Sequence, residues 1–207
     1  MRIVLIAIVS CVILAGCSGK EVWAPDETVT KAAYRHDGPP RLTLFTMINR
    51  KNGNGGHSSL MVNGSQRVIF DPAGSFKHPS IPERNDLVFG ITPAVEDVYT
   101  RYHARETWYV KIQELDVSPQ VAEQVMQLAS NYGAVPSAYC ARSTSTILSQ
   151  IFPDRVSTTW YPKQLAAAFA QVPGVREQDF YEDDSDDNSK VLKEWNPGAV
   201  AQAALAE

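Results

Sequence analysis

Cysteine is scarce in this chain, with three in 207 residues, at positions 11, 17 and 140. The apolar run at the N-terminus, residues 3–14, is shorter than the roughly 20 residues that a membrane-spanning helix needs. The formal net charge is −4, and there is no basic stripe interleaved with aromatic residues. Internal repeats are also lacking. These absences argue against a repeat protein, against a membrane-spanning anchor and against a nucleic-acid partner.

The bulk composition is that of an ordinary globular protein, with 44% hydrophobic and 20% charged residues. The length allows one domain with a proper hydrophobic core. We therefore expect a single folded domain rather than a disordered or fibrous chain.

The N-terminus reads as an export signal, because Arg2 precedes the apolar run of residues 3–14. The run ends in Leu14-Ala15-Gly16-Cys17, which resembles the bacterial lipobox. That resemblance implies that Cys17 is acylated, becomes the new N-terminus and anchors the protein to membrane lipid. Ser18 after the cysteine indicates, by analogy with enteric lipoproteins, the outer membrane facing the periplasm. A plain secretory signal with an accidental cysteine remains the alternative.

Composition shifts divide the chain into four segments. Residues 1–16 are the expected signal peptide, and residues 17–40, with Gly, Pro and scattered charges, are an expected tether. Ordered structure is expected to begin near Arg41, with a folded domain over residues 41–181. Residues 182–207 hold an acidic run, expected to be solvated, and an Ala-rich end.

Strand and helix patterns predict an α+β domain in which an antiparallel sheet packs against helices. The expected strands are residues 42–48, 57–62, 66–71, 86–91 and 107–115. The expected helices are residues 119–132, a helix that begins near Cys140, and residues 163–171.

Cys140 is the candidate nucleophile, because it stands where a loop turns into a helix whose apolar face includes Ile147, Leu148 and Ile151. Backbone N–H groups and the dipole at a helix N-terminus favour a thiolate and lower the pKa from its free value of about 8.5. Once Cys11 leaves with the signal and Cys17 is acylated, Cys140 has no disulfide partner. An unpaired thiol in an oxidising compartment favours a chemical role, although a buried structural cysteine remains the alternative.

His57 is the candidate general base for Cys140, because it opens a strand after a glycine-rich loop. The other histidines, His36, His78 and His103, lie in the tether or in polar connecting stretches, with His78 as the reserve candidate for a site role.

Asp71, at the end of the partner strand, is the candidate group that orients His57. Register decides whether it can. If residues 63–64 form a two-residue turn, His57 lies opposite Phe70 and Asp71 faces the other side of the sheet. A three-residue loop over residues 63–65 places Asp71 directly opposite His57, and this is the favoured register. A plain turn that begins at Asp71 is nearly as good an interpretation.

Three motifs together resemble the circularly permuted papain-like proteins, a group related to NlpC-type cell-wall peptidases and lecithin retinol acyltransferases, in which the histidine precedes the cysteine. The motifs are Gly56-His57-Ser58-Ser59-Leu60, Tyr139-Cys140-Ala141, and Thr159-Trp160-Tyr161-Pro162-Lys163-Gln164-Leu165. The likeness covers residues 42–171. It implies a permuted papain-like fold with Cys140 as nucleophile, His57 as base and a polar orienting group on the second strand. The chain lacks the Asn-Cys or Phe-Cys-Ser pair of the group, so the group's substrates are not carried over.

The expected function is that of an envelope lipoprotein with a cysteine hydrolase site, an amidase or peptidase that works through an acyl-enzyme, with peptidoglycan peptide as the expected substrate. No cofactor and no metal ion are expected. Two alternatives stay open: a binding or structural lipoprotein with the same fold and no turnover, and a lipid acyltransferase or thioesterase.

Overall fold

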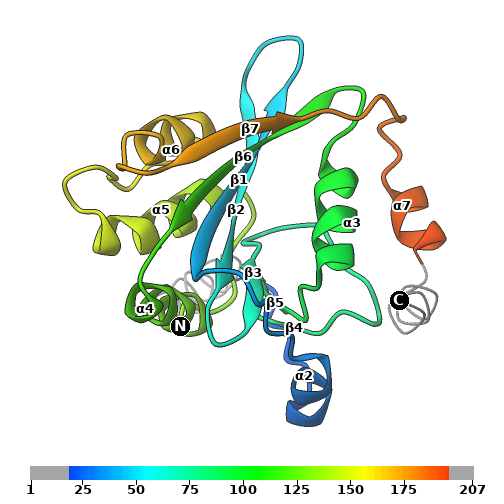
Figure 1. Ribbon diagram of the computed structural model, residues 1–207. Helices are drawn as coiled ribbons and strands as arrows, with labels where there is room; N and C mark the ends of the chain where they lie inside the picture. The colour runs from blue at the N-terminus through cyan, green and yellow to red at the C-terminus, as the bar shows by residue number, and fades with distance from the viewer. Residues whose placement is uncertain (1–18, 196–207) are drawn as a thin grey trace, which may run out of the picture.

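A seven-stranded antiparallel sheet runs through the middle of the molecule, in the order β4-β5-β3-β2-β1-β6-β7 (Figure 1). The computed structural model describes residues 19–195, so the predicted signal peptide, Cys17 and the Ala-rich end lie outside the described residues. The strands are β1 Arg41–Asn49, β2 Gly55–Asn63, β3 Arg67–Phe70, β4 Glu83–Arg84, β5 Leu87–Phe89, β6 Trp108–Asp116 and β7 Arg176–Phe180. The prediction of an α+β domain with an antiparallel sheet is confirmed.

Helices cover both faces of this sheet (Figure 1). One face packs against α4 Pro119–Ser130, α5 Cys140–Ile151 and α6 Pro162–Phe169, and the other against α3 Pro93–His103 and α7 Ser189–Glu194, while α2 Asp26–Ala32 lies beyond the β4 edge. Strand β1 is buried along residues 42–48 because it is covered from both sides, which explains its nearly continuous apolar sequence. Within residues 19–195, no helix is both long and apolar enough to cross a membrane.

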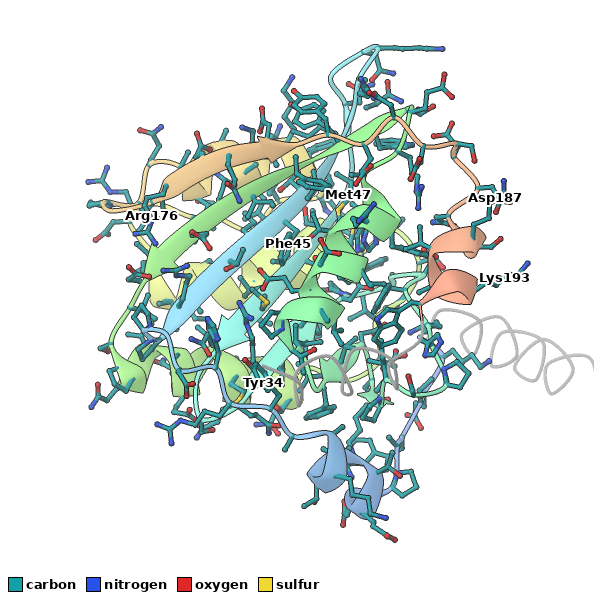
Figure 2. The ribbon with its side chains drawn as sticks, turned by 45° about the vertical axis from the view of Figure 1, so that its right-hand side comes forward. Tyr34, Phe45, Met47, Arg176, Asp187 and Lys193 are labelled. Atoms are coloured by element: carbon teal, nitrogen blue, oxygen red, sulfur yellow. The ribbon has the colours of Figure 1, made fainter. Side chains whose placement is uncertain are left out.

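Two hydrophobic cores form, one on each face of the sheet. Leu42 and Leu44 point toward α4, α5 and α6, whereas Phe45 and Met47 point toward α3 (Figure 2). Full burial of each such side chain contributes about 1.5–3 kcal/mol. Both cores hold the central strands β1 and β2 in place, and β2 carries His57.

The N-terminal segment is not the free tether that its composition predicts. The backbone N–H of Ala24 donates to the Glu83 carbonyl at 3.0 Å, and Arg84 donates to the Ala24 carbonyl at 2.9 Å. Helix α2 follows, and the Tyr34 carbonyl accepts a hydrogen bond from the Arg67 N–H at 2.7 Å. Residues 22–34 therefore pack along the outer part of the sheet, and the prediction that ordered structure begins near Arg41 is corrected.

The acidic run after β7 is exposed, as its composition predicts, but three of its aspartates also contact Arg50, Arg105 and Thr107. Asp183 lies 3.0 Å from Arg50, and Asp184 lies 3.4 Å from Arg105, a side chain that is only 6% exposed. Asp186 accepts hydrogen bonds from the Thr107 backbone N–H and hydroxyl. The run crosses the end of the sheet, and α7, which follows it in the sequence, packs beside α3.

Candidate active site

His57 and Asp71 meet through a register that differs from both predicted ones. In the β2–β3 pairing, Asn63 lies opposite Arg67. If the same pairing is continued beyond the end of β3, Asp71 lies opposite Ser59, which places it diagonally across from His57. The shift of two residues preserves the face, because side chains alternate with a period of two. His57 Nε2 lies 2.7 Å from Asp71 Oδ1. The prediction that Asp71 faces His57 is confirmed, while its directly opposite position is wrong.

A gap in the sheet makes room for α5 beside His57. Strand β3 ends at Phe70 and pairs only with Leu60–Asn63, so residues 55–59 of β2 have β1 on one side and no paired strand on the other within residues 19–195. The N-terminus of α5 packs there, since the backbone N–H of Ser58 donates to the Cys140 sulfur. The sheet edge and the helix start thus bring the histidine and the cysteine together.

Cys140 is the first residue of α5, and it is 7% exposed. Burial raises the pKa of its thiol, but hydrogen bonding and charge interaction with His57 outweigh burial, and the Ser58 and Ala141 backbone N–H groups add to them. The net effect lowers the pKa of Cys140. The predicted thiolate-favouring position is therefore supported by contacts with three residues, His57, Ser58 and Ala141.

His57 shows the opposite shift. Burial lowers its pKa, but the negative charge of Asp71, the hydrogen bond to Asp71 and the interaction with Cys140 together raise the pKa to about 10. Burial raises the pKa of Asp71, and the positive charge of His57 lowers it to about 2. Because Nε2 of His57 is hydrogen-bonded to Asp71, the ring nitrogen that remains to interact with Cys140 is Nδ1. Asp71 is thus held as a carboxylate and His57 as an imidazolium, and the lowered pKa of Cys140 favours its thiolate more than in a free cysteine.

Tyr99 on α3 is a site residue that the sequence analysis missed. Its buried hydroxyl lies 2.8 Å from Asp71 Oδ1 and 2.6 Å from Ser59 Oγ. A hydroxyl has one proton and a carboxylate only accepts, so Tyr99 donates to Asp71 and accepts from Ser59. Burial raises the pKa of Tyr99 well above its ordinary value, so it stays a donor. This contact fixes the Asp71 oxygen that bonds His57.

His103, at the end of α3, stacks on His57 with ring centroids 5.8 Å apart and the planes inclined by 17°. Its Nδ1–H donates to the Tyr99 carbonyl at 2.8 Å. Burial lowers the pKa of His103 to about 4, so the ring is neutral at physiological pH. His103 was expected in a polar connecting stretch. It instead forms a neutral wall beside the imidazolium of His57.

Asp86 links the two halves of the site. Its Oδ1 accepts from the Ala73 N–H at 3.2 Å, and its Oδ2 accepts from the Val135 N–H at 2.7 Å. Ala73 belongs to the turn that starts at Asp71, and Val135 belongs to the loop that leads to Cys140. One buried carboxylate therefore holds the orienting group and the nucleophile loop at a fixed spacing.

Asp71 also begins a tight turn. The residue therefore both contacts His57 and starts a turn, the two interpretations that its sequence position allows. The Gly74 N–H donates to the Asp71 carbonyl at 2.9 Å, with Pro72 and Ala73 between them, and Ala73 has a φ of 57°. A Cβ added at Gly74 would lie 1.9 Å from Asp71 Oδ2. Only glycine leaves room here for the carboxylate.

We expect Gly74→Ala to displace the Asp71 carboxylate and cost about 1–3 kcal/mol of folding free energy, as overpacking does. Loss of the Asp71 charge from His57 should raise the pKa of Cys140, measured as a shift of its alkylation rate profile to higher pH. Gly64→Ala is the matched control, because its Cβ would come close only to the flexible end of Glu123, with the Ala122 Cβ at an ordinary contact distance of 3.7 Å. An unchanged profile in Gly74→Ala would show that this glycine does not position Asp71.

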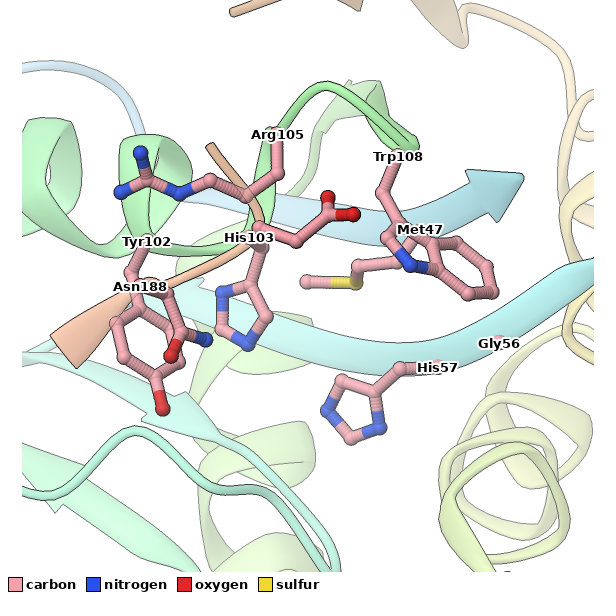
Figure 3. A pocket seen from close by; sticks show the side chains of 9 residues that line it. Met47, Gly56, His57, Tyr102, His103, Arg105, Trp108 and Asn188 are labelled. Atoms are coloured by element: carbon pink, nitrogen blue, oxygen red, sulfur yellow. The ribbon is translucent and has the colours of Figure 1, made fainter. Parts of the chain in front are cut away.

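A cavity of about 260 Å³ opens beside His57. Figure 3 shows His57 and His103 on one side of it and Met47 and Trp108 on another. Gly56 belongs to its wall, and an added Cβ there would lie 2.6 Å from the Trp108 ring. The cavity can accept a small group of a substrate next to the imidazole.

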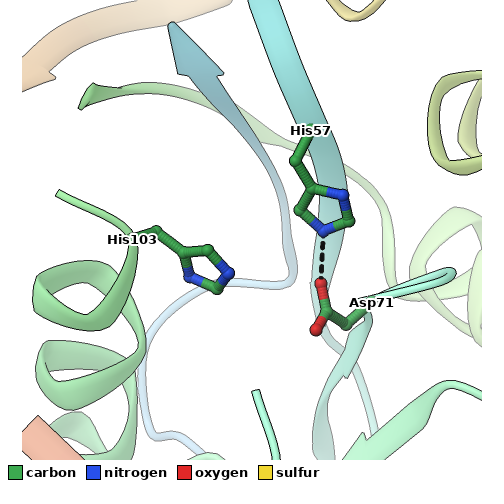
Figure 4. A group of neighbouring side chains, drawn as sticks. All are labelled: His57, Asp71 and His103. Atoms are coloured by element: carbon green, nitrogen blue, oxygen red, sulfur yellow. Dashed lines mark hydrogen bonds and ion pairs between the residues drawn. The ribbon is translucent and has the colours of Figure 1, made fainter. Parts of the chain in front are cut away.

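His57, Asp71 and His103 also offer three ligand atoms within 4.8 Å of one another, a set that could hold a metal ion (Figure 4). The contacts favour proton chemistry instead. The His57 nitrogen that faces the cluster is already bonded to Asp71, and a pKa of about 10 retains the proton that a metal would have to displace. We therefore treat the group as an acid–base system.

The structure brings together Cys140, His57 and Asp71, the three catalytic candidates from the sequence. The reserve candidate His78 lies elsewhere, bonded to Ser80 and packed on Trp195. Tyr99 and His103 were missed, although their helix carries a usable signal: Thr92 caps it, and Pro93 stands at its first position.

Comparison of this chain with protein-family models, with curated proteins and with solved structures finds no match. What the site does must therefore be judged from its own geometry.

Proposed function

We propose that the protein is a cysteine hydrolase of permuted papain-like fold that cleaves an amide, ester or thioester through an acyl-enzyme. One observation carries the proposal: Cys140, the first residue of α5, hydrogen-bonds His57, whose far ring nitrogen lies 2.7 Å from Asp71 Oδ1. The pKa of Cys140 is lowered and that of His57 is raised, as expected for such a pair. A buried structural thiol would have its pKa raised by burial. The order of residues, histidine before cysteine, agrees with the permuted group that the motifs resemble.

The reaction follows from this arrangement. The Cys140 thiolate attacks the carbonyl carbon, a C–S bond forms, and the carbonyl electron pair moves to oxygen. When the bond to the leaving group breaks, the His57 imidazolium gives its proton to the departing nitrogen or oxygen. His57, then neutral, takes a proton from water as the water attacks the thioester. The C–S bond breaks, and the acid leaves while the thiolate and imidazolium are restored.

The N-terminus of α5 supplies the electrostatic support for this step. The N–H of Cys140 belongs to the first turn, where backbone donors lack partners within the helix. The Ala141 N–H already serves the sulfur. We assign the Cys140 N–H as the donor to the developing oxyanion.

Peptidoglycan peptide is the proposed substrate, because the N-terminal sequence directs the protein to the cell envelope as a lipoprotein. The cavity beside His57, of about 260 Å³, would accept a short peptide side chain. Catalytically silent binding and lipid acyl transfer are the competing functions, and substrate turnover separates them.

The test is to trap the acyl-enzyme. We expect intact protein quenched with acid during turnover of cell-wall stem peptides to carry a hydroxylamine-sensitive acyl group on the peptide containing Cys140. Cys140→Ala should lose both the adduct and product formation, while Cys140→Ser tests whether a hydroxyl can replace the thiol. Undiminished hydrolysis by Cys140→Ala would refute the proposal, and adducts formed only from phospholipid would move the substrate to lipid.

The lipoprotein part has its own prediction. Because acylation of Cys17 is proposed as the anchor, Cys17→Ala should leave an unprocessed precursor without the lipid mass, whereas the signal peptidase inhibitor globomycin should leave an unprocessed precursor that carries it. Mass spectrometry of the N-terminus and membrane fractionation measure this. A normally matured, membrane-retained Cys17→Ala protein would contradict acylation at Cys17.

A further inference from the structure

The start of the described chain lies against the loop that leads to Cys140. A Cβ added at Gly19 would come within 2.5 Å of the Ala134 carbonyl carbon and 2.6 Å of the Val135 nitrogen. The Gly19 backbone is therefore packed directly on this loop. Cys17 precedes Gly19 by two residues, which span at most about 7 Å. An acyl group on Cys17 would thus be anchored next to the active-site loop and not at the end of a 24-residue tether.

Exposed aromatic side chains gather around the same loop. Tyr132 and Tyr139 flank it and are 37% and 39% exposed. Trp160 packs edge-on against Tyr139, with ring centroids 4.6 Å apart, and is itself 46% exposed. Tyrosine and tryptophan with an apolar body and a polar tip are the residues that favour the interfacial layer of a bilayer.

Positive charges accompany these rings. Arg142 lies over the Trp160 ring at 4.7 Å from its centroid. Lys20 lines, together with Gly19 and Tyr139, an open cavity of about 770 Å³. The acidic groups of that cavity are already engaged: Glu83 pairs with Lys77, and Asp86 accepts two backbone N–H groups. The cations are therefore available for lipid phosphates.

We propose that the surface formed by Gly19, Lys20, Tyr132, Tyr139, Arg142 and Trp160 rests on a phospholipid bilayer and holds Cys140, the residue after Tyr139, at the membrane surface. The proposal rests on the lipoprotein part of the proposed function, because the acyl group on Cys17 supplies the anchor. The partner is the bilayer interface, reached through a two-residue link, aromatic rings and two cations. Substrates would then be met at the membrane surface.

The test uses tryptophan fluorescence of the full acylated chain in vesicles of phosphatidylethanolamine and phosphatidylglycerol, with and without brominated acyl chains. Brominated lipid should quench the wild-type protein, and Trp160→Phe should show less quenching, with Trp23, itself 64% exposed, contributing to what remains. Trp195→Phe is the matched control and should keep the wild-type quenching, since Trp195 packs edge-on against His78 and is not among the residues of this surface. Cys140→Ala should also keep it, so a failed hydrolase assignment leaves this result unchanged.

Two results would overturn the proposal, and they are distinguishable. An acylated protein that sediments with vesicles yet shows no quenching dependent on Trp160 would mean that this face points away from the bilayer. A protein without acyl mass that does not bind the vesicles would remove the anchor and, with it, the lipoprotein assignment. Replacement of Tyr139 and Trp160 together by serine should reduce quenching at least as much as Trp160→Phe, while the acyl group keeps the protein on the vesicles.

Discussion

Asp71→Asn is expected to destabilise the fold by about 3–5 kcal/mol, the cost of removing one partner from a buried ion pair. Asp71 is 2% exposed at its side chain and His57 is 16% exposed, so the imidazolium would lose its counter-charge in a place that water scarcely reaches. Burial alone lowers the pKa of His57. The variant should therefore hold a neutral histidine, and turnover should fall because an amide can also hold the ring in the wrong tautomer.

The pH dependence of this loss has a defined sign. The folded pKa of Asp71, about 2, lies below its ordinary value of about 3.9, so its stabilisation is present above about pH 4 and is lost as the pH falls toward 2. The folded pKa of His57, about 10, lies above its ordinary value of about 6.5, so its stabilisation is complete below about pH 6.5 and is lost as the pH rises toward 10.

Urea unfolding of wild type and Asp71→Asn should therefore differ most between about pH 4 and pH 6.5. Asp154→Asn is the control, because Asp154 is exposed in a loop and should change stability little. Equal stability of Asp71→Asn and wild type across this range would mean that Asp71 and His57 do not form a charged pair.

His57→Ala should lower the rate of Cys140 alkylation at pH 6, because without the imidazole the pKa of the thiol rises toward its ordinary value of about 8.5, and such a thiol is almost wholly protonated at this pH. The hydrogen bond and charge of His57 are the largest influences that lower the pKa of Cys140, and the helix N-terminus alone supplies only about 0.3–1 kcal/mol. The measurement is the iodoacetamide rate from pH 5 to 10, followed by mass spectrometry.

His78→Ala is the matched control for this experiment and should leave the profile unchanged, since His78 bonds to Ser80 away from the site. A wild-type Cys140 that reacts only after denaturation would indicate a buried structural thiol and favour a binding protein. Reactivity that is unaltered in His57→Ala would keep Cys140 as nucleophile and remove His57 as its base.

Local patterns predicted the elements that carry the nucleophile and its base. Helix α4 has a serine cap, a proline at its first position and one apolar stripe, and α5 starts at Cys140, where the pattern places it. Strands β1 and β2 are apolar runs bounded by turn residues. Such signals lie within one segment and need no knowledge of its neighbours.

The missed features depend on contacts between distant segments. The α3 sequence carries an apolar stripe at Val95, Val98, Tyr99 and Tyr102 that predicts the helix, but the role of Tyr99 appears only when its hydroxyl meets Ser59 on β2. The pairing register of β2 against β3 depends on which three residues form the loop between the two strands. Residues 22–34 and the acidic run contact residues that are distant in the sequence. Composition does not reveal such contacts, so on composition alone both segments were predicted to lie in solvent.

The most direct test of the ion pair is the protonation state of His57, measured by NMR of its ring nitrogens in the full chain at pH 8. We expect both nitrogens to carry protons at pH 8 and titration to occur near pH 10. In Asp71→Asn, titration should move to a much lower pH. A wild-type His57 that titrates near pH 6.5, with a neutral ring at pH 8, would contradict the thiolate–imidazolium pair and the hydrolase built on it.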